Sequence, residues 1–435
     1  MRHVAVMTAT GSIGLMSIFV VDLLSLFYVS RLGDQTLKAA VGYSSQVQFL
    51  AMAINIGLTI AVSATVSRAL GAGDRARARR LAASGLTICA ITASIIALGL
   101  FVYREPILQV ALHAQGRSFE VASNFLAITL PANILMGFGM CFSGVLRAAG
   151  DARRAMYVTL AGGIVTAFTD PLLIFGFGLG VYGAAWATVI SRLVFFGVGA
   201  WGTIGIHKLV APPNFRAMLG DIRPIMTIGF PAILANLATP VAAVYTTRIF
   251  SDFGEAAVAA SAIIDRVIPV LFGVIFALTG SIGPIIGQNL GAKLMGRVRR
   301  AITDSFVLSV GYAFVAWAAL ALLSPLIVAG FDAQGESAHL VTFFGRYGVS
   351  AWVFITCLFV ANTVFNNLGF PLLSTAFNWG RATLGTIPFA TLGAKFGGVE
   401  GAMLGVAFGA ALFGLSAVAT AYYVTSRLAK RMKAL

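Results

Sequence analysis

Charged side chains are scarce in this sequence: Asp, Glu, Lys and Arg make up only 10% of its 435 residues. A soluble protein carries about 25% charged residues, so this composition excludes an ordinary soluble domain. Hydrophobic residues make up 59% and fall in long blocks, whereas an amphipathic helix would space them three or four residues apart. The block Leu81–Val102 is long enough to cross a bilayer as a helix. We therefore predict an integral membrane protein.

Cysteine and the motifs of soluble enzymes are also scarce or missing. Cys89, Cys141 and Cys357 lie inside hydrophobic blocks without metal-ligand spacing, and we interpret them as packing residues. The sequence contains no zinc motif, phosphate-binding loop or nucleophile elbow. We therefore expect no enzymatic activity, no metal ion and no cofactor. A membrane-embedded enzyme is the least favoured alternative, because no facing acids, histidines or nucleophiles are evident.

Hydrophobic segments long enough to span a bilayer recur through the whole chain, and the connections between them are short. We count twelve, at about 4–29, 39–66, 81–102, 123–146, 155–178, 183–203, 223–250, 258–289, 302–328, 340–366, 370–393 and 399–424. The predicted fold class is an all-α integral membrane protein.

Acidic residues are half as numerous as basic ones, 15 against 30, which gives a formal net charge of +15. The basic residues gather in alternate connections, which is how a membrane protein sets its orientation, so we expect no nucleic-acid partner. With Arg381 included, 21 of them lie on the side that carries both termini and five on the other. We predict cytoplasmic termini in a protein of the cell inner membrane, with the lipid bilayer around it.

The two halves of the chain repeat each other. The matches keep one order and a nearly constant offset: SRALGAGDRARARR (67–80) with GQNLGAKLMGRVRR (287–300), GVYGAA (180–185) with GVEGAM (398–403), and Pro171 with Pro388. An even number of spans per repeat relates the halves by an axis along the membrane normal, as in transporters with parallel repeats. We predict two pseudo-symmetric six-helix lobes, residues 1–204 and 223–435, joined by a cytoplasmic linker at 205–222.

Ionisable residues inside the predicted spans are candidates for function, because a charge near the bilayer centre costs about 2.5–3.5 kcal/mol. In the first half these residues are Asp22, Asp170 and Arg192, and in the second half Asp265 and Arg266. At the repeat offset the partner of Asp170 is an isoleucine, so a proton or cation site is expected in the first lobe. The alternatives are structural: an Asp170–Arg192 ion pair, and packing roles for Asp265 and Arg266.

Pro171 follows Asp170 directly and removes a backbone hydrogen-bond donor, which predicts a bend. The carbonyl freed by the bend needs a protein or water partner, a setting that suits an ion site beside a cavity. Polar side chains near enough to join the site are Thr166 and Thr188, with Asn55 and Asn133 as weaker candidates. Residues that could line a substrate cavity are Asn55, Asn133, Arg192, Asp265 and Arg266.

Several motifs, in order along the chain, resemble the multidrug and toxic compound extrusion (MATE) family. They are FYVSRLG after the first-span acid, LGAGDRARARR, LRAAGDARR (146–154), DPLLIFGFGLGVYGAAWAT (170–188) and GQNLGA (287–292). The resemblance implies two six-helix lobes and cation-coupled antiport of amphipathic organic compounds through a cavity between the lobes.

The resemblance also implies a coupling site in the first lobe. Asp170 and Thr188 match the family's acid and threonine, whereas Thr166 stands where the family has asparagine. Ser25 occupies the usual place of the first-span acid, and Asp22 lies one helical turn earlier. These departures remove oxygen ligands from a sodium site but leave a carboxylate that can bind a proton. The site is thus predicted to use Asp22, Ser25, Thr166, Asp170 and Thr188, with Pro171 as hinge.

The predicted function is export of small organic compounds by a monomeric antiporter with alternating access, coupled to H⁺, with Na⁺ as the alternative ion. A second hypothesis keeps the architecture and makes the protein a dedicated exporter or flippase of one anionic metabolite or lipid-linked precursor. Arginines lining the cavity would favour that hypothesis, and phenylalanine and methionine would favour varied drugs.

Overall fold

The computed structural model describes residues 2–112, 114–212 and 215–433, and these residues form helices and connections without strands. The first half contains α1 (Arg2–Ser30), α2 (Gln35–Gly71), α3 (Arg75–Val102), α4 (Arg104–Pro106), η1 (Ile107–Ala111), α5 (Gly116–Thr129), α6 (Asn133–Ala148), α7 (Ala152–Pro171), η2 (Leu172–Gly176), α8 (Val181–Ala200) and η3 (Trp201–Ile206). The second half contains α9 (Phe215–Ser251), α10 (Glu255–Gly291), α11 (Met295–Gly330), α12 (Gly335–Phe343), η4 (Phe344–Gly348), α13 (Ser350–Leu368), α14 (Pro371–Gly380), η5 (Arg381–Gly385) and α15 (Ile387–Lys433). Elements labelled η are π-helical turns.

The helices agree with the twelve predicted spans once two breaks are recognised. Among the described residues, ten helical stretches are long and apolar enough to cross a membrane, and α5 with α6 forms an eleventh, bent by 52°. The last stretch, Pro371–Met432, is too long for one crossing. Its helix α15 contains non-helical backbone at Gly397 and Gly398, where φ of Gly398 is +59°. Glycine adopts this conformation without strain, so the chain turns there and crosses twice.

The chain forms two compact units, each described separately below. The N-terminal unit is Thr10–Ile233, and the C-terminal unit is Leu234–Leu435 together with Met1–Ala9. The boundary lies inside α9, whereas the sequence placed a linker at 205–222. The start of α9 belongs to the N-terminal unit because Asp221 is buried there, where Ser84 donates to it at 2.8 Å and Arg80 at 3.1 Å.

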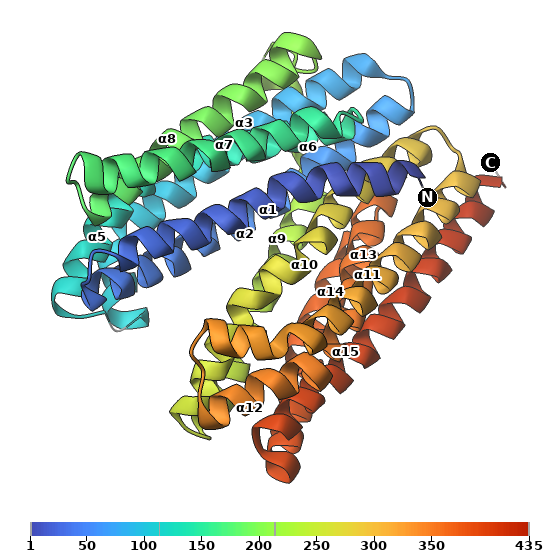
Figure 1. The fold of residues 1–435 in the computed structure, drawn as a ribbon. Helices are drawn as coiled ribbons and strands as arrows, with labels where there is room; N and C mark the ends of the chain where they lie inside the picture. The colour runs from blue at the N-terminus through green and yellow to red at the C-terminus, as the bar shows by residue number, and fades with distance from the viewer. Residues whose placement is uncertain (1, 113, 213–214, 434–435) are drawn as a thin grey trace. The chain divides into compact units, whose positions relative to one another are not determined.

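Within the N-terminal unit, α1 lies alongside α7, as Figure 1 shows. A side chain at Gly14 of α1 would overlap the Thr159 hydroxyl of α7, so this glycine permits the close approach. A second close approach joins η2 to α8, where a Cβ at Gly183 would lie 2.7 Å from the backbone of Ile174. This packing fixes the end of α7, which carries Asp170, between α1 and α8.

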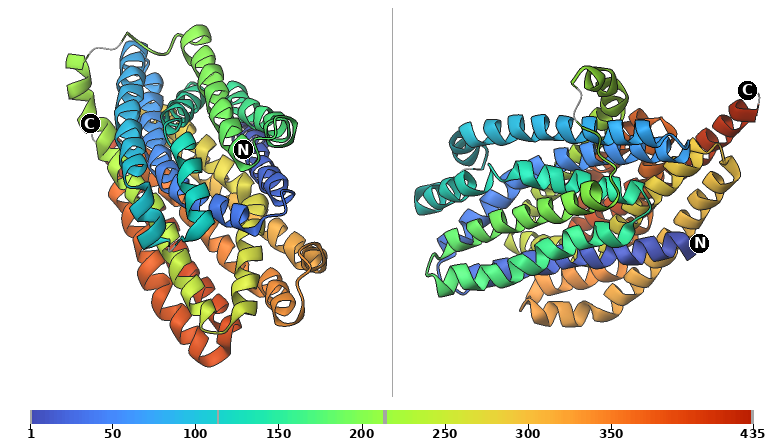
Figure 2. Two further views of the ribbon diagram at one scale, coloured as in Figure 1. Left: turned by 90° about the vertical axis from the view of Figure 1, so that its left-hand side faces the viewer. Right: turned by 90° about the horizontal axis from the view of Figure 1, so that it is seen from above.

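Within the C-terminal unit, the two parts of α15 pack on each other through small residues. Gly393 and Gly401 approach backbone to backbone, and Gly409 meets the carbonyl of Gly385, the last residue of η5 before α15. Burying an apolar side chain between helices gains little free energy in a bilayer, because the lipid tails are themselves apolar. Close packing of the helix backbones therefore holds such helices together. The left view of Figure 2 shows orange and red helices of this unit running beside one another, in agreement with the packing of α13 on α15.

Candidate functional site

Asp170 is the most enclosed carboxylate within the described spans of the N-terminal unit. It lies in the last turn of α7, and 1% of its surface is exposed. The hydroxyl of Ser25, on α1, donates a hydrogen bond to Asp170 Oδ2. Asp170 Oδ1 is buried and has no hydrogen-bond partner among the described residues. One oxygen of this carboxylate is therefore held in place, and the other is free to receive a proton.

Pro171 marks a change in the helix that carries Asp170. The α-helical turns of α7 end at this proline, and the wider π-helical turn η2 begins at Leu172. Proline has no N–H to continue the ladder of backbone bonds, which accounts for the change at this place. Single π-helical turns within α-helices often accompany functional sites. The carboxylate thus sits at the point where the helix is least regular.

Asp22 lies one helical turn before Ser25 on α1, and its side chain is exposed. It is near enough to Asp170 for the two charges to interact. Asp22, Ser25 and Asp170 therefore form one cluster between α1 and α7, in which only Asp170 is enclosed.

Thr166 and Thr188 lie on the helices that flank this cluster, but their hydroxyl protons are engaged locally. The Thr166 hydroxyl donates to the carbonyl of Gly162 and the Thr188 hydroxyl to the carbonyl of Ala184, both at 3.0 Å. Each oxygen can still accept a hydrogen bond. A cation would need several such oxygens turned toward it, whereas a proton needs only the carboxylate.

The structural alternative required an ion pair between Arg192 and Asp170, and the structure shows no such pair among the described residues. The Arg192 guanidinium donates to the carbonyl of Thr129 at 2.6 Å and to the side-chain oxygen of Gln48. Among the described residues no salt bridge includes Arg192 or Asp170. Gln48 is a partner that the sequence analysis did not identify, because its contact with α8 depends on how α2 packs.

Asn55 and Asn133, the weaker candidates, contact each other. Asn55 Nδ2 donates to Asn133 Oδ1 at 3.3 Å, and both residues are buried. Asn55 Oδ1 and Asn133 Nδ2 have no partner among the described residues. The pair joins α2 to α6 and retains one carbonyl oxygen and one NH2 group for a further polar group.

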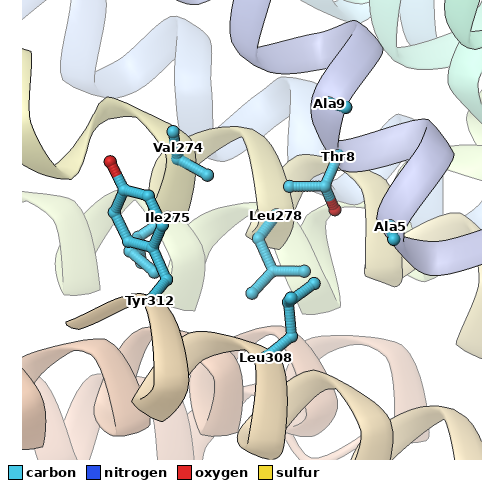
Figure 3. Close-up of a pocket in the computed structure, with 8 residues that line it drawn as sticks. All are labelled: Ala5, Thr8, Ala9, Val274, Ile275, Leu278, Leu308 and Tyr312. Atoms are coloured by element: carbon cyan, nitrogen blue, oxygen red, sulfur yellow. The ribbon is translucent and has the colours of Figure 1, made fainter. Parts of the chain in front are cut away.

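The remaining predicted residues, Asp265 and Arg266, belong to the C-terminal unit. Both lie on α10 with exposed side chains. The same unit contains an apolar cavity of about 140 Å³ between the start of α1, α10 and α11. Figure 3 shows Thr8 and the ring of Tyr312 at this cavity, among aliphatic side chains. Neither Asp265 nor Arg266 lines it.

Arg381 is the intramembrane charge that the sequence analysis placed wrongly. The charge count assigned it to a connection, but the structure places it ten residues after Pro371 within one helical stretch. Only 7% of its surface is exposed. Its position inside the predicted span 370–393 was the signal that could have identified it.

A polar cluster outside the spans ties the start of α7 to the end of η3. Asp151 accepts a hydrogen bond from the Arg154 backbone amide at 3.0 Å, and His207 Nε2 lies 2.7 Å from its carboxylate. Burial alone would raise the pKa of Asp151. Hydrogen bonds from the Arg154 amide, His207 and the Arg154 guanidinium outweigh that effect and hold the pKa below its usual value. The cluster therefore favours an ionised carboxylate.

Comparisons with known proteins agree with this architecture. The family model MatE matches residues 12–172 and 231–392. The FAD transporter of Shewanella oneidensis is 29% identical over 98% of this chain and 95% of its own. The probable multidrug resistance protein NorM of Thermotoga maritima is 27% identical over 64% of this chain and 61% of its own.

The crystal structure of the Vibrio cholerae MATE transporter VcmN in the bent form has the same fold. It matches with a TM-score of 0.91 at 24% identity, over 98% of this chain and 97% of that one. The predicted all-α fold with twelve helices in two lobes is thereby confirmed. The family match covers a large part of each half, and the relatives and structural neighbours are transporters. This chain is a member of the MatE family of multi-pass membrane transporters.

Proposed function

We propose that this protein exports organic compounds across the inner membrane in exchange for protons, and that Asp170 carries the coupling proton. The observation that supports this most directly is the state of its carboxylate. Ser25 donates a hydrogen bond to one oxygen, while the other is buried and has no partner in the described part of the chain. An ionised carboxylate in that setting loses hydration that one hydroxyl cannot replace. Protonation removes that cost, so the site can alternate between two charge states.

Proton binding is better supported than sodium binding. The hydroxyl protons of Thr166 and Thr188 point to backbone carbonyls of their own helices, and Ser25 brings a neutral hydroxyl where the family has an acid. A sodium site would have to reorient these side chains or use water. A proton needs no set of ligands. Asp22, one helical turn before Ser25 on α1, adds a second carboxylate to the cluster.

Coupling follows if protonation changes the shape of α7. Asp170 lies directly before Pro171 and the π-helical turn η2, so its contact with Ser25 on α1 fixes the irregular end of the helix. Breaking or remaking that contact would alter the bend. Proton and substrate are then linked when each favours a different conformation, or when both compete for one.

The proposed substrates are amphipathic organic compounds. A second candidate is one dedicated anionic metabolite or lipid-linked precursor. The observation that favours it is that the relative matching 98% of this chain is named an FAD transporter, whereas the NorM relative matches 64%. We further propose cytoplasmic termini, from the distribution of basic residues, and a monomer as the working unit.

Transport in proteoliposomes with separately imposed gradients tests this proposal. The protein is reconstituted, and efflux of a fluorescent compound is followed under a pH gradient alone, a Na⁺ gradient alone, and neither. We expect acceleration by the pH gradient and none by Na⁺. Acceleration by Na⁺ at constant pH would contradict proton coupling, and efflux unaffected by both gradients would contradict antiport.

A further inference from the structure

The C-terminal unit contains a buried guanidinium in the middle of a membrane-spanning stretch. Arg381 begins η5, ten residues after the start of α14, which corresponds to about 15 Å along a helix. It therefore lies near the centre of a hydrocarbon layer of about 30 Å. With 7% of its surface exposed, the side chain does not extend freely to an interface. A charge at that depth is costly and calls for a partner.

No such partner is present among the described residues. No salt bridge includes Arg381, and its Nε is buried without a hydrogen-bond acceptor. None of the described acidic residues of the C-terminal unit is buried. Arg192 of the N-terminal unit differs, because a carbonyl and an amide oxygen accept its hydrogen bonds. Arg381 thus carries a positive charge that no described acidic residue neutralises.

Arg381 has buried polar residues near it on its own helical stretch, and this stretch is tied to α9. Ser374 and Asn378 are buried on the same helix, at spacings that bring them to the face of Arg381. Trp379 Nε1 donates to the carbonyl of Leu234 at 3.0 Å, which anchors this helix to α9. Ala238 of α9 packs with Ala382, the residue that follows Arg381 in the chain. A buried guanidinium beside polar groups suits the oxygens of an anion.

We propose that Arg381 recognises the anionic group, a carboxylate or phosphate, of the organic compounds that this protein transports. This inference rests on the proposed antiport function and specifies its substrate class. It assigns one role to each unit: Asp170 in the N-terminal unit binds the proton, and Arg381 in the C-terminal unit binds the anionic group of the substrate. Retaining an uncompensated buried charge is costly for folding, and a ligand that supplies the counter-charge explains why it is there.

The test compares an anionic with a cationic dye in the reconstituted protein. Vesicles of phosphatidylcholine, whose headgroups carry no net charge, contain wild-type protein, Arg381→Gln, Arg381→Lys, or Arg299→Gln as a control. Arg299 is exposed at the start of α11. Its substitution therefore removes one positive charge from the same unit, at a place away from Arg381. Carboxyfluorescein and ethidium are followed separately under an imposed pH gradient.

We expect Arg381→Gln to slow carboxyfluorescein transport by about tenfold or more, because one partner of a desolvated charge pair is lost. Carboxyfluorescein transport by Arg381→Lys should be slower than in the wild type and faster than in Arg381→Gln. Lysine keeps the positive charge but cannot donate two parallel hydrogen bonds to one anionic group, as arginine can. Arg299→Gln should match the wild type. Carboxyfluorescein transport at the wild-type rate in Arg381→Gln, or transport of ethidium alone by the wild type, would overturn the assignment. Failure of the pH gradient to drive either dye would instead contradict the proposed antiport function.

Two further measurements separate recognition from a structural role. Thermal unfolding of Arg381→Gln in detergent should begin at the same or a higher temperature than in the wild type, because an unpaired buried charge is removed. A marked decrease would indicate that the guanidinium holds the fold. Wild-type protein in detergent should also bind carboxyfluorescein more tightly than ethidium, by fluorescence anisotropy. Equal or weaker binding of the anion would overturn the proposal without use of any variant.

Discussion

The hydroxyl of Ser25 on α1 donates a hydrogen bond to the buried carboxylate of Asp170 on α7, 145 residues later in the chain. The second oxygen of Asp170 has no partner among the described residues. Directly after Asp170, α7 gives way to the π-helical turn η2. This arrangement links the charge of one carboxylate to the packing of two helices within the N-terminal unit, and the coupling hypothesis depends on it.

Replacing Ser25 by alanine should weaken coupling without unfolding the protein. The change removes the hydrogen bond that Ser25 donates to the carboxylate, and such bonds to charged groups contribute about 1.5–3 kcal/mol. Transport driven by a pH gradient should therefore fall roughly tenfold. Ser45→Ala is a matched control on α2, because the exposed Ser45 hydroxyl bonds only the carbonyl of Val41 on its own helix. Equal rates for the two variants would contradict a role for Ser25.

The close packing of the last two spans predicts a strong effect of bulk at Gly409. A side chain there would overlap the carbonyl of Gly385, which is backbone and cannot rotate away. Gly409→Leu should lower the free energy of unfolding by about 1–3 kcal/mol or more, seen as an earlier thermal transition in detergent. Gly311 of α11 has open space around it, so Gly311→Leu serves as control. A similar loss in both variants would mean that bulk at this contact is not the cause.

The Asp151 cluster predicts a pH-dependent contribution to stability. Because the pKa of Asp151 in the folded protein lies below its usual value of 3.8, ionised Asp151 stabilises the fold at neutral pH. That contribution is lost as the pH falls below the usual value and through the folded pKa. Asp151→Asn keeps an oxygen for the helix cap but removes the charge. It should lower the unfolding temperature at neutral pH and reduce the further decrease on acidification.

Asp74→Asn is the matched control for Asp151. Asp74 caps α3 in the same way, by accepting from the Arg77 amide at 2.8 Å, but it is exposed. Unfolding temperatures of both variants are measured from neutral pH to about pH 3. If the two variants lose the same stability at neutral pH, the contacts of Asp151 with His207 and Arg154 contribute nothing beyond the cap.

Much of the fold follows from the sequence, because spanning helices require long apolar segments and the two halves repeat. The way in which the helices pack is harder to predict from the sequence. The contact of Ser25 with Asp170 could be anticipated, since the resemblance placed Ser25 at the position of the family's acid. The pairing of Arg192 with Gln48 could not, because it joins α8 to α2 through tertiary packing.

Arg381 illustrates a different limit of the sequence analysis. Counting basic residues by connection treats every arginine as a marker of orientation, so a buried functional arginine is hidden among the others. The structure distinguishes it by burial, because Arg381 is the arginine that is buried among the described residues, and its Nε has no described acceptor. Asp170 was easier to identify, since acids are few and the second half has no counterpart to it.

The most direct test of the coupling hypothesis is transport by Asp170→Asn in proteoliposomes under an imposed pH gradient. Asparagine keeps the shape of the side chain and can still accept the hydrogen bond from Ser25, but it cannot gain or lose a proton. We predict that efflux driven by the pH gradient falls to the rate seen without a gradient, while thermal unfolding stays close to that of the wild type. Efflux at the wild-type rate down the same gradient would contradict the role of Asp170 as the coupling group.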